Sequence, residues 1–246
     1  MIENANDPST GQTLTDHLTD LRNCLVKSAY GVVVGTLLCW MFSEKMFDII
    51  RAPIAPYLET GGLVFTNPMD KFMAHIKLAF MGGVMVSCPV WLYQLWSFIA
   101  PGLYANEKKY TITFITAGSG LFASGVLFVY FVVFPAAFHF LLTFGGTADK
   151  PMITISEYLS FFITTTLVFG AAFELPLVIV LLGMIGVVNS TMLREKRRYA
   201  IVAIAAVAAV VTPPDLLSML LLLIPMWGFY EISILIVALL EKKRAA

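Results

Sequence analysis

The stretch LVFGAAFELPLVIVLL, Leu167–Leu182, decides the fold. Its single ionisable residue, Glu174, has apolar neighbours on both sides for more than one helical turn. The stretch belongs to a longer apolar run, 159–188, and a helix needs only roughly 20 such residues to cross a bilayer core of roughly 30 Å. Pro176 lacks a backbone donor, so we expect the helix to open near the Ala172 carbonyl. This stretch predicts a membrane-spanning helix that carries an acid.

The cost of burying a charge leaves three states open for Glu174. An ionised carboxylate inside a bilayer is expensive, so this residue faces a cavity, pairs with a partner or stays protonated. A structural role, as a polar lock between two helices, also accounts for it. Intramembrane acids often mark functional sites, and we therefore expect Glu174 to act in function.

The composition of the whole chain is also typical of a membrane protein. The chain has 246 residues, of which 59% are hydrophobic and 13% are charged, whereas soluble domains have roughly 45–50% and about 25%. The mean hydropathy is +0.83. A water-soluble globule of this size cannot bury so much apolar surface, which excludes a soluble enzyme, a disordered chain and a disulfide-stapled module. The formal net charge is zero, so no overall field recruits nucleic acid.

The number of spans follows from run lengths and from the placement of Lys and Arg. Five apolar runs are long enough to span, and they are 25–42, 78–99, 112–134, 159–188 and 216–240. A sixth run, 200–211, reaches only about 18 Å as a helix. If it spans, eleven Lys and Arg residues lie inside and five outside; if it is re-entrant, the split is eight to eight. We therefore predict an all-α integral membrane protein with six transmembrane helices and both termini cytoplasmic, whose last two spans are short or tilted.

The chain is predicted to form one polytopic membrane domain, 1–246. Residues 1–24 form a cytoplasmic amphipathic N-terminal segment, residues 43–75 a structured outer loop interrupted by prolines, and residues 241–246 a basic cytoplasmic tail. No cleavable signal peptide is visible, so we expect the chain to enter the membrane through its own spans. Gly31 with Gly35, and Gly120 with Ser124, have the spacing that lets membrane helices approach closely.

Catalytic and metal-binding motifs are not found in the sequence. The chain has no GxSxG, HExxH or Walker motif. The three histidines fall on both membrane faces in the six-span topology, and the three cysteines lie in or beside apolar runs without a CxxC pair. We therefore predict no enzymatic activity, no metal site and no cofactor. On the residues alone, Glu107 is a solvated loop charge and Asp215 an N-cap of the last helix.

Seven segments, taken in order, resemble the TatC family, the C component of the twin-arginine protein translocase. They are HLTDLR (17–22), AP (52–53), FM (80–81), PVWLYQLWSFIAPGLYANE (89–107), YFVVFP (130–135), FGAAFELP (169–176) and TPPD (212–215). The resemblance covers nearly the whole chain. It implies a six-helix protein of the bacterial cytoplasmic (inner) membrane with both termini in the cytoplasm, which agrees with the charge count.

The resemblance also implies a function and partners. Such a protein is the receptor for the twin-arginine signal peptides of folded cargo and the core of a translocase driven by the proton-motive force. Its expected partners are small single-span subunits (TatA/TatB-like), further copies of itself and the lipid bilayer, and no nucleic acid is expected.

The resemblance assigns roles to seven residues. Glu107 and Asp20 would receive the paired arginines of the signal peptide, and Arg22 and Phe98 would shape the same site. The positions tied in the family to assembly or transport are Pro53, Glu174 and Asp215.

Two other functions remain open from the sequence. The first is a secondary transporter of a small charged solute with Glu174 as its midplane site. The second is a purely structural scaffold, in which the inner-face acids could be replaced without loss of export.

Overall fold

The computed structural model describes residues 14–58, 62–99, 111–143, 152–212 and 216–245. Its regular secondary structure there is helical apart from one isolated bridge between Val64 and Thr154, and turns and irregular segments join the helices. Its helical elements, in chain order, are α1 (Leu14–Trp40), α2 (Ser43–Arg51), η1 (Ala55–Tyr57), α3 (Asp70–Val86), α4 (Cys88–Ile99), α5 (Thr111–Phe128), η4 (Val129–Val133), α6 (Phe134–Thr143), α7 (Ile155–Phe173), α8 (Leu175–Met184), α9 (Ser190–Glu195), α10 (Arg197–Val211) and α11 (Leu216–Ala245).

Several of these elements are long and apolar enough to cross a membrane. In the described residues, four helical stretches qualify: Leu18–Trp40, Thr111–Thr143, Ile155–Met184 and Leu216–Lys243. The pair α3 and α4 makes a fifth if it forms one span, bent by 53°. The prediction of an all-α membrane protein is confirmed. Helix α10 has 15 residues, or about 22 Å, so the sixth span stays a prediction.

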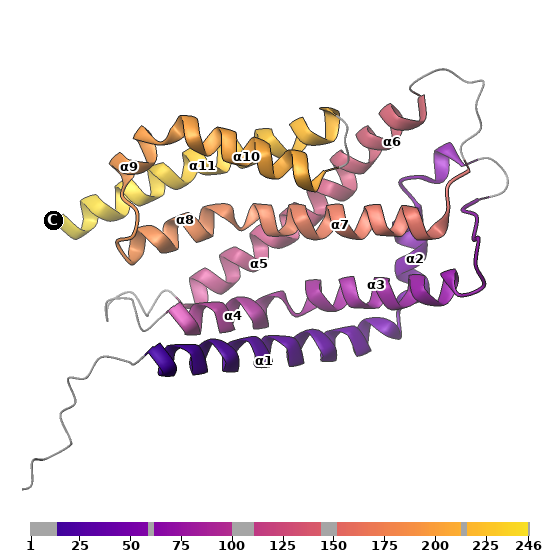
Figure 1. Cartoon of the computed structure of the whole chain (residues 1–246), viewed down its shortest axis with the longest axis horizontal. Coiled ribbons are helices and arrows are strands. Elements are labelled where there is room, and N and C mark those ends of the chain that lie inside the picture. Colours follow the sequence, from indigo (N-terminus) through magenta and orange to yellow (C-terminus); the bar gives the residue numbers. More distant parts are fainter. Residues whose placement is uncertain (1–13, 59–61, 100–110, 144–151, 213–215, 246) are drawn as a thin grey trace, which may run out of the picture.

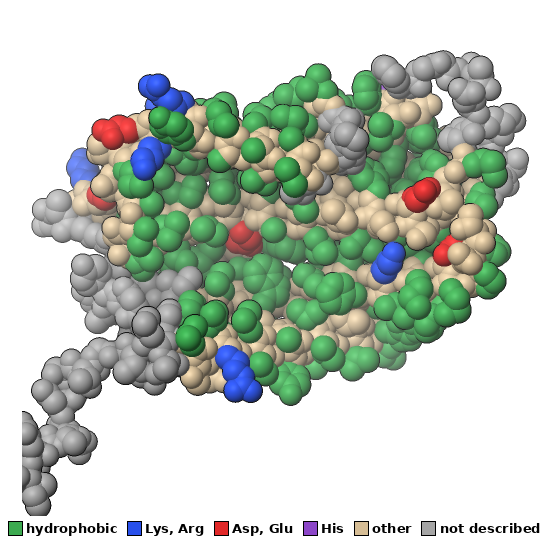
Figure 2. Space-filling model, in the orientation of Figure 1, with side chains coloured by type: hydrophobic (Ala, Val, Ile, Leu, Met, Phe, Trp, Pro, Cys, Tyr) green, Lys and Arg blue, Asp and Glu red, His purple; other side chains and the backbone are tan. Residues whose placement is uncertain are grey.

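The helices lie roughly along one axis of the molecule (Figure 1). Helix α1 packs on α3 and α4, α7 and α8 occupy the middle, and α10 and α11 pack together on the far side. The start of α1 and the end of α11 lie at the same end of the bundle, and α2 lies at the opposite end. Figure 2 shows hydrophobic side chains over most of the visible face, with most visible Lys and Arg side chains in the half that carries the C-terminus.

Small residues bring α1 against α3 and α4, as the Gly31 and Gly35 spacing predicts. A Cβ at Gly35 would lie 2.8 Å from the Gly83 carbonyl oxygen, and one at Gly31 would lie 3.0 Å from Val90 Cγ1. The same expectation is wrong for Gly120, where an added Cβ would meet no atom within 4 Å. Spacing alone does not tell which glycine faces a neighbouring helix.

The third helical stretch continues beyond its predicted end at Phe134. Because Pro135 has no N–H to donate, an ordinary α-helical turn would leave a carbonyl unpaired. The five residues of η4 form a π-turn immediately before this proline, and the helix then runs on to Thr143. A π-turn within a helix absorbs the irregularity without ending it.

Two tyrosines tie the spans to α2 at the end opposite the C-terminus. The Tyr158 hydroxyl donates a 2.5 Å hydrogen bond to the Ile50 carbonyl oxygen, and the Tyr130 hydroxyl donates one of 2.9 Å to that of Ile49. The last carbonyls of a helix have no partner within it. The Tyr158 phenol supplies such a partner to Ile50, whereas the Ile49 carbonyl also accepts from the Ala52 N–H at 3.2 Å, and both phenols hold α2 across the end of the bundle.

Candidate functional site

Glu174 lies at the junction of α7 and α8, about two thirds of the way along the long apolar stretch Ile155–Met184. Helix α7 ends at Phe173, and Pro176 lies in the first turn of α8, so the local opening expected from this proline is confirmed. The side chain is buried, with 7% of the residue exposed. Neither carboxylate oxygen has a hydrogen-bond partner among the described residues.

A glycine on a neighbouring helix makes room for this carboxylate. A Cβ at Gly118 of α5 would lie 3.2 Å from Glu174 Oε2 and 2.8 Å from Leu92 Cδ1 of α4. Glu174 therefore faces the contact between α4 and α5. The Ser119 hydroxyl oxygen, next in the chain, is also buried and lies beside the Cys88 thiol. No sequence pattern linked Gly118 to Glu174, since Gly118 is one glycine among others inside an apolar span.

Three of the four predicted signal-peptide residues, Asp20, Arg22 and Phe98, lie toward the end of the bundle where α1 begins and α11 ends. Helix α1 crosses α4 where Gly31 meets Val90, and the two helices run in opposite directions (Figure 1). At a rise of 1.5 Å per residue, Asp20 lies about 16 Å along α1 from this crossing, and Phe98 lies about 12 Å along α4 from it. Both lie on the side of the crossing toward the same end of the bundle. Asp20 and Arg22 are exposed, and Phe98 is half-buried. The structure thus brings α1 and the end of α4 together here.

The remaining predicted site residues lie elsewhere or outside the described residues. Pro53 is half-buried between α2 and η1, at the other end of the bundle. Glu107 and Asp215 fall outside the described residues. The predicted residues are thus spread over both ends and the middle of the bundle rather than forming one cluster.

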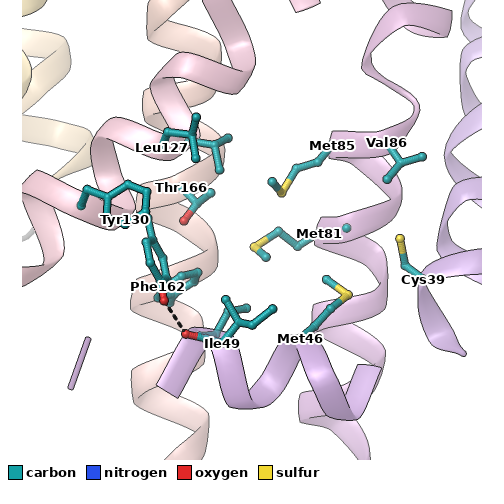
Figure 3. Close-up of a pocket in the computed structure, with 14 residues that line it drawn as sticks. Cys39, Met46, Ile49, Met81, Met85, Val86, Leu127, Tyr130, Phe162 and Thr166 are labelled. Carbon is teal, nitrogen blue, oxygen red and sulfur yellow. Dashed lines mark hydrogen bonds between the residues drawn. The ribbon is translucent and has the colours of Figure 1, made fainter. Parts of the chain in front are cut away.

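An apolar cavity of about 430 Å³ opens between α2, α3 and the helical stretch α5–η4, with α7 at its back. In Figure 3 the side chains of Met46, Met81 and Met85 point into it, and Tyr130 forms its hydrogen bond to Ile49 at one edge. The Thr166 hydroxyl is buried and without a partner among the described residues. The described residues that line this cavity include no charged side chain, so they offer volume but no group for acid–base chemistry.

Metal binding finds no support in the part of the chain that the structure describes. Within it, no three His, Cys, Asp or Glu side chains lie close enough together to hold a metal ion. Cys24, Cys39 and Cys88 are free thiols.

The chain is similar to a set of known proteins over most of its length. A family model described as "Sec-independent protein translocase protein (TatC)" matches residues 16–225. Proteins with that name are 36% identical to it in Desulforapulum autotrophicum, over 94% of this chain and 86% of theirs, and 38% identical in Escherichia coli strain K12, over 91% and 87%.

A solved structure is also similar. The crystal structure of a protein described as the twin arginine translocase receptor TatC matches with a TM-score of 0.78 and 35% identity, over 90% of this chain and 97% of that one. These relatives are translocase components, so the alternative of a small-solute transporter is not supported. With sequence, fold and several apolar spans in agreement, the chain belongs to the TatC family of Sec-independent protein translocase proteins, as a multi-pass membrane component.

Proposed function

We propose that this chain is the receptor that binds twin-arginine signal peptides of folded cargo at the end of the bundle where α1 begins. The observation that supports the proposal is the packing of α1 on α4, on which exposed Asp20 and half-buried Phe98 both lie toward this end of the bundle. The segment that contains Glu107 follows α4 directly. Two carboxylates, from α1 and from this segment, are then available on the same side of the membrane.

The chemistry of arginine explains why two acids suit this ligand. Arginine stays charged at any accessible pH, and its planar fork bonds a carboxylate through two parallel hydrogen bonds. Two consecutive arginines offer two forks. Asp20 and Glu107 together therefore favour a peptide with two arginines over a peptide with one. Exposed ion pairs contribute only about 0–1 kcal/mol each. The apolar part of the signal peptide therefore supplies much of the affinity by lying against the bundle.

The topology proposed for this function has six spans, with both termini in the cytoplasm and the protein in the bacterial inner membrane. The start of α1 and the end of α11 at one end of the bundle support it. The Lys and Arg residues at that end accord with the excess of positive charge on the cytoplasmic side of membrane proteins.

Glu174 is proposed to contact a polar group on the single span of a small TatA/TatB-like subunit. Its oxygens are buried and without a partner in the described residues, and a donor from a neighbouring helix would repay that cost. Pro53 and Asp215 are proposed to act in assembly or transport. Export itself would draw on the proton-motive force, with the chain acting as a receptor rather than an enzyme.

The test is crosslinking of a twin-arginine signal peptide to the purified protein, beside a twin-lysine peptide. The lysine peptide keeps the charge but loses the second parallel bond, so we expect weaker crosslinking. Glu107→Ala should weaken crosslinking of the arginine peptide, while Glu195→Ala, at an exposed acid of α9, should not. Equal crosslinking of both peptides, or of the Glu107→Ala variant, would contradict the proposal.

A further inference from the structure

A second cavity, of about 310 Å³, lies at the end of the bundle opposite the proposed signal-peptide site. It is formed by α2, by the first turns of α3, by the segment before α3 and by the start of α7. Its ionisable lining residues are Arg51, Lys71 and His75, and the described residues that line it include no acid. This volume lies at the lower end of the range for small-ligand sites, roughly 300–1,000 Å³.

One turn of α2 and one turn of α3 place the lining side chains on facing sides of the cavity. Phe47 and Arg51 are four residues apart on α2, and Lys71 and His75 are four residues apart on α3, so each pair shares a helix face. The Phe47 and His75 rings join the two faces, with their centroids 5.9 Å apart. The Arg51 guanidinium carbon lies 5.7 Å from the centroid of the Phe47 ring.

The segment before α3 completes the wall and is pinned in place. The Val64 N–H donates to the Ile153 carbonyl oxygen at 3.0 Å, and the Ile155 N–H donates to that of Val64 at 2.8 Å. These bonds hold Phe65 over the cavity, where its ring lies 4.7 Å from Lys71 Nζ. The two cations are thus positioned by aromatic rings before any ligand arrives.

Among the described residues, three acids lie near this cavity without lining it: Asp48, Asp70 and Glu44, the last in a neighbouring pocket with Phe72 and His75. Asp48 pairs with Arg51 at 3.1 Å, but both side chains are largely exposed, and such pairs contribute about 0–1 kcal/mol. Asp70 Oδ2 accepts three hydrogen bonds, from the Thr66 N–H, the Thr66 hydroxyl and the Asn67 N–H. Lys71 forms no ion pair with a described acid.

We propose that this cavity binds the phosphate of an anionic phospholipid. The fork of Arg51 suits phosphate oxygens through two parallel bonds, and Lys71 adds a point charge from the other side. Exposed apolar residues continue from the cavity along α3, at Phe72, Ile76 and Phe80, spaced one turn apart. They offer a surface for acyl chains, which a free phosphate ion would not use. Basic side chains bind anionic phosphate groups through charge-assisted hydrogen bonds.

The test measures lipid binding to the purified full chain in detergent by native mass spectrometry. The probes are dihexanoyl phosphatidylglycerol, dihexanoyl phosphatidylcholine and inorganic phosphate. We expect phosphatidylglycerol to bind more tightly than the zwitterionic lipid. The double variant Arg51→Gln/Lys71→Gln should lose about fivefold in affinity for each cation removed. The control Lys45→Gln removes an exposed cation of α2 outside the cavity and should leave binding unchanged.

A charge-preserving variant separates loss of the site from loss of the fold. Arg51→Lys/Lys71→Arg should bind phosphatidylglycerol close to the wild-type level, and thermal unfolding should show that all variants are folded. Unchanged binding in the Gln double variant, or equal losses in Lys45→Gln, would overturn the proposal. Inorganic phosphate that binds as tightly as phosphatidylglycerol would overturn the assignment to a lipid. Because these residues lie at the opposite end from Asp20, neither result depends on signal-peptide binding.

Discussion

The Tyr158 hydroxyl reaches the Ile50 carbonyl oxygen at 2.5 Å, and through this bond α7 holds the end of α2. Tyr158 is buried, with 3% of the residue exposed. Nearby, the more accessible Tyr130 makes the equivalent bond to Ile49. The position of α2 thus depends on two phenols that come from helices far along the chain.

Tyr158→Phe removes this bond but keeps the ring. The Ile50 carbonyl then loses its partner in a buried place, and we expect the free energy of unfolding to fall by about 1–3 kcal/mol. Thermal unfolding in detergent measures the change. Tyr130→Phe serves as the matched control and should cost less, because the Ile49 carbonyl keeps its hydrogen bond from the Ala52 N–H. A larger loss of unfolding free energy in Tyr130→Phe than in Tyr158→Phe would contradict this prediction.

Gly35→Ala should force α1 and α3 apart. The new Cβ would lie 2.8 Å from the Gly83 carbonyl oxygen, and overpacking of this kind costs about 1–3 kcal/mol. Gly120→Ala, where the added Cβ meets open space, should leave the unfolding temperature unchanged or raise it slightly, since alanine favours a helix. Equal unfolding temperatures for the two variants would show that the contact between α1 and α3 has room for the added methyl group.

Glu174→Gln should lower export without lowering the stability of the fold. Neutralising a buried carboxylate that lacks a partner removes a cost of burial, so the unfolding temperature should stay the same or rise. Export of a twin-arginine precursor should fall in Glu174→Gln and be lost in Glu174→Ala. The control Glu157→Gln changes an acid in the first turn of α7 and should export normally. Full export by Glu174→Ala would remove this residue from the mechanism.

Asp20 is expected to contribute modestly to signal-peptide binding. Because the side chain is exposed, Asp20→Ala should weaken binding of a twin-arginine peptide by no more than about fivefold, the equivalent of about 1 kcal/mol. Asp20→Glu keeps the charge, lengthens its reach by one methylene and should bind at least as well as the wild type. Peptide titrations followed by fluorescence anisotropy measure both. Tighter binding by Asp20→Ala would exclude an attractive contact.

The six-span topology predicts that α2 and the C-terminal tail lie on opposite sides of the membrane. With Cys24, Cys39 and Cys88 replaced by Ala, single cysteines can be placed at Asp48 and at Lys242. A membrane-impermeant maleimide applied to cells with a permeabilised outer membrane should label the cysteine at 48. It should label the one at 242 only after the inner membrane is broken. Labelling of both from outside would make α10 a re-entrant helix.

The sequence predicted that these helices exist, but it did not predict the residues at which they begin and end. Helix α3 begins at Asp70, eight residues before the predicted span start at Leu78, so it takes up the end of the predicted outer loop 43–75. The third stretch runs to Thr143, nine residues past Phe134. Hydropathy measures only the part of a helix inside the hydrocarbon core, whereas backbone hydrogen bonding continues into the polar boundary. The packing of α1 on α4, in which Gly31 meets Val90, needed the tertiary structure.

The sequence by itself determined that this chain crosses a membrane several times and carries an acid, Glu174, within one span. Both follow from local run lengths, because each apolar run must match the bilayer whatever lies beside it. Only the tertiary structure decided that Gly118 faces Glu174, that Tyr158 holds Ile50, and that Arg51 and Lys71 share one cavity. Tyr158 and Ile50 are 108 residues apart in the chain. Contacts of that kind depend on which helix faces pack together, and no local pattern specifies them.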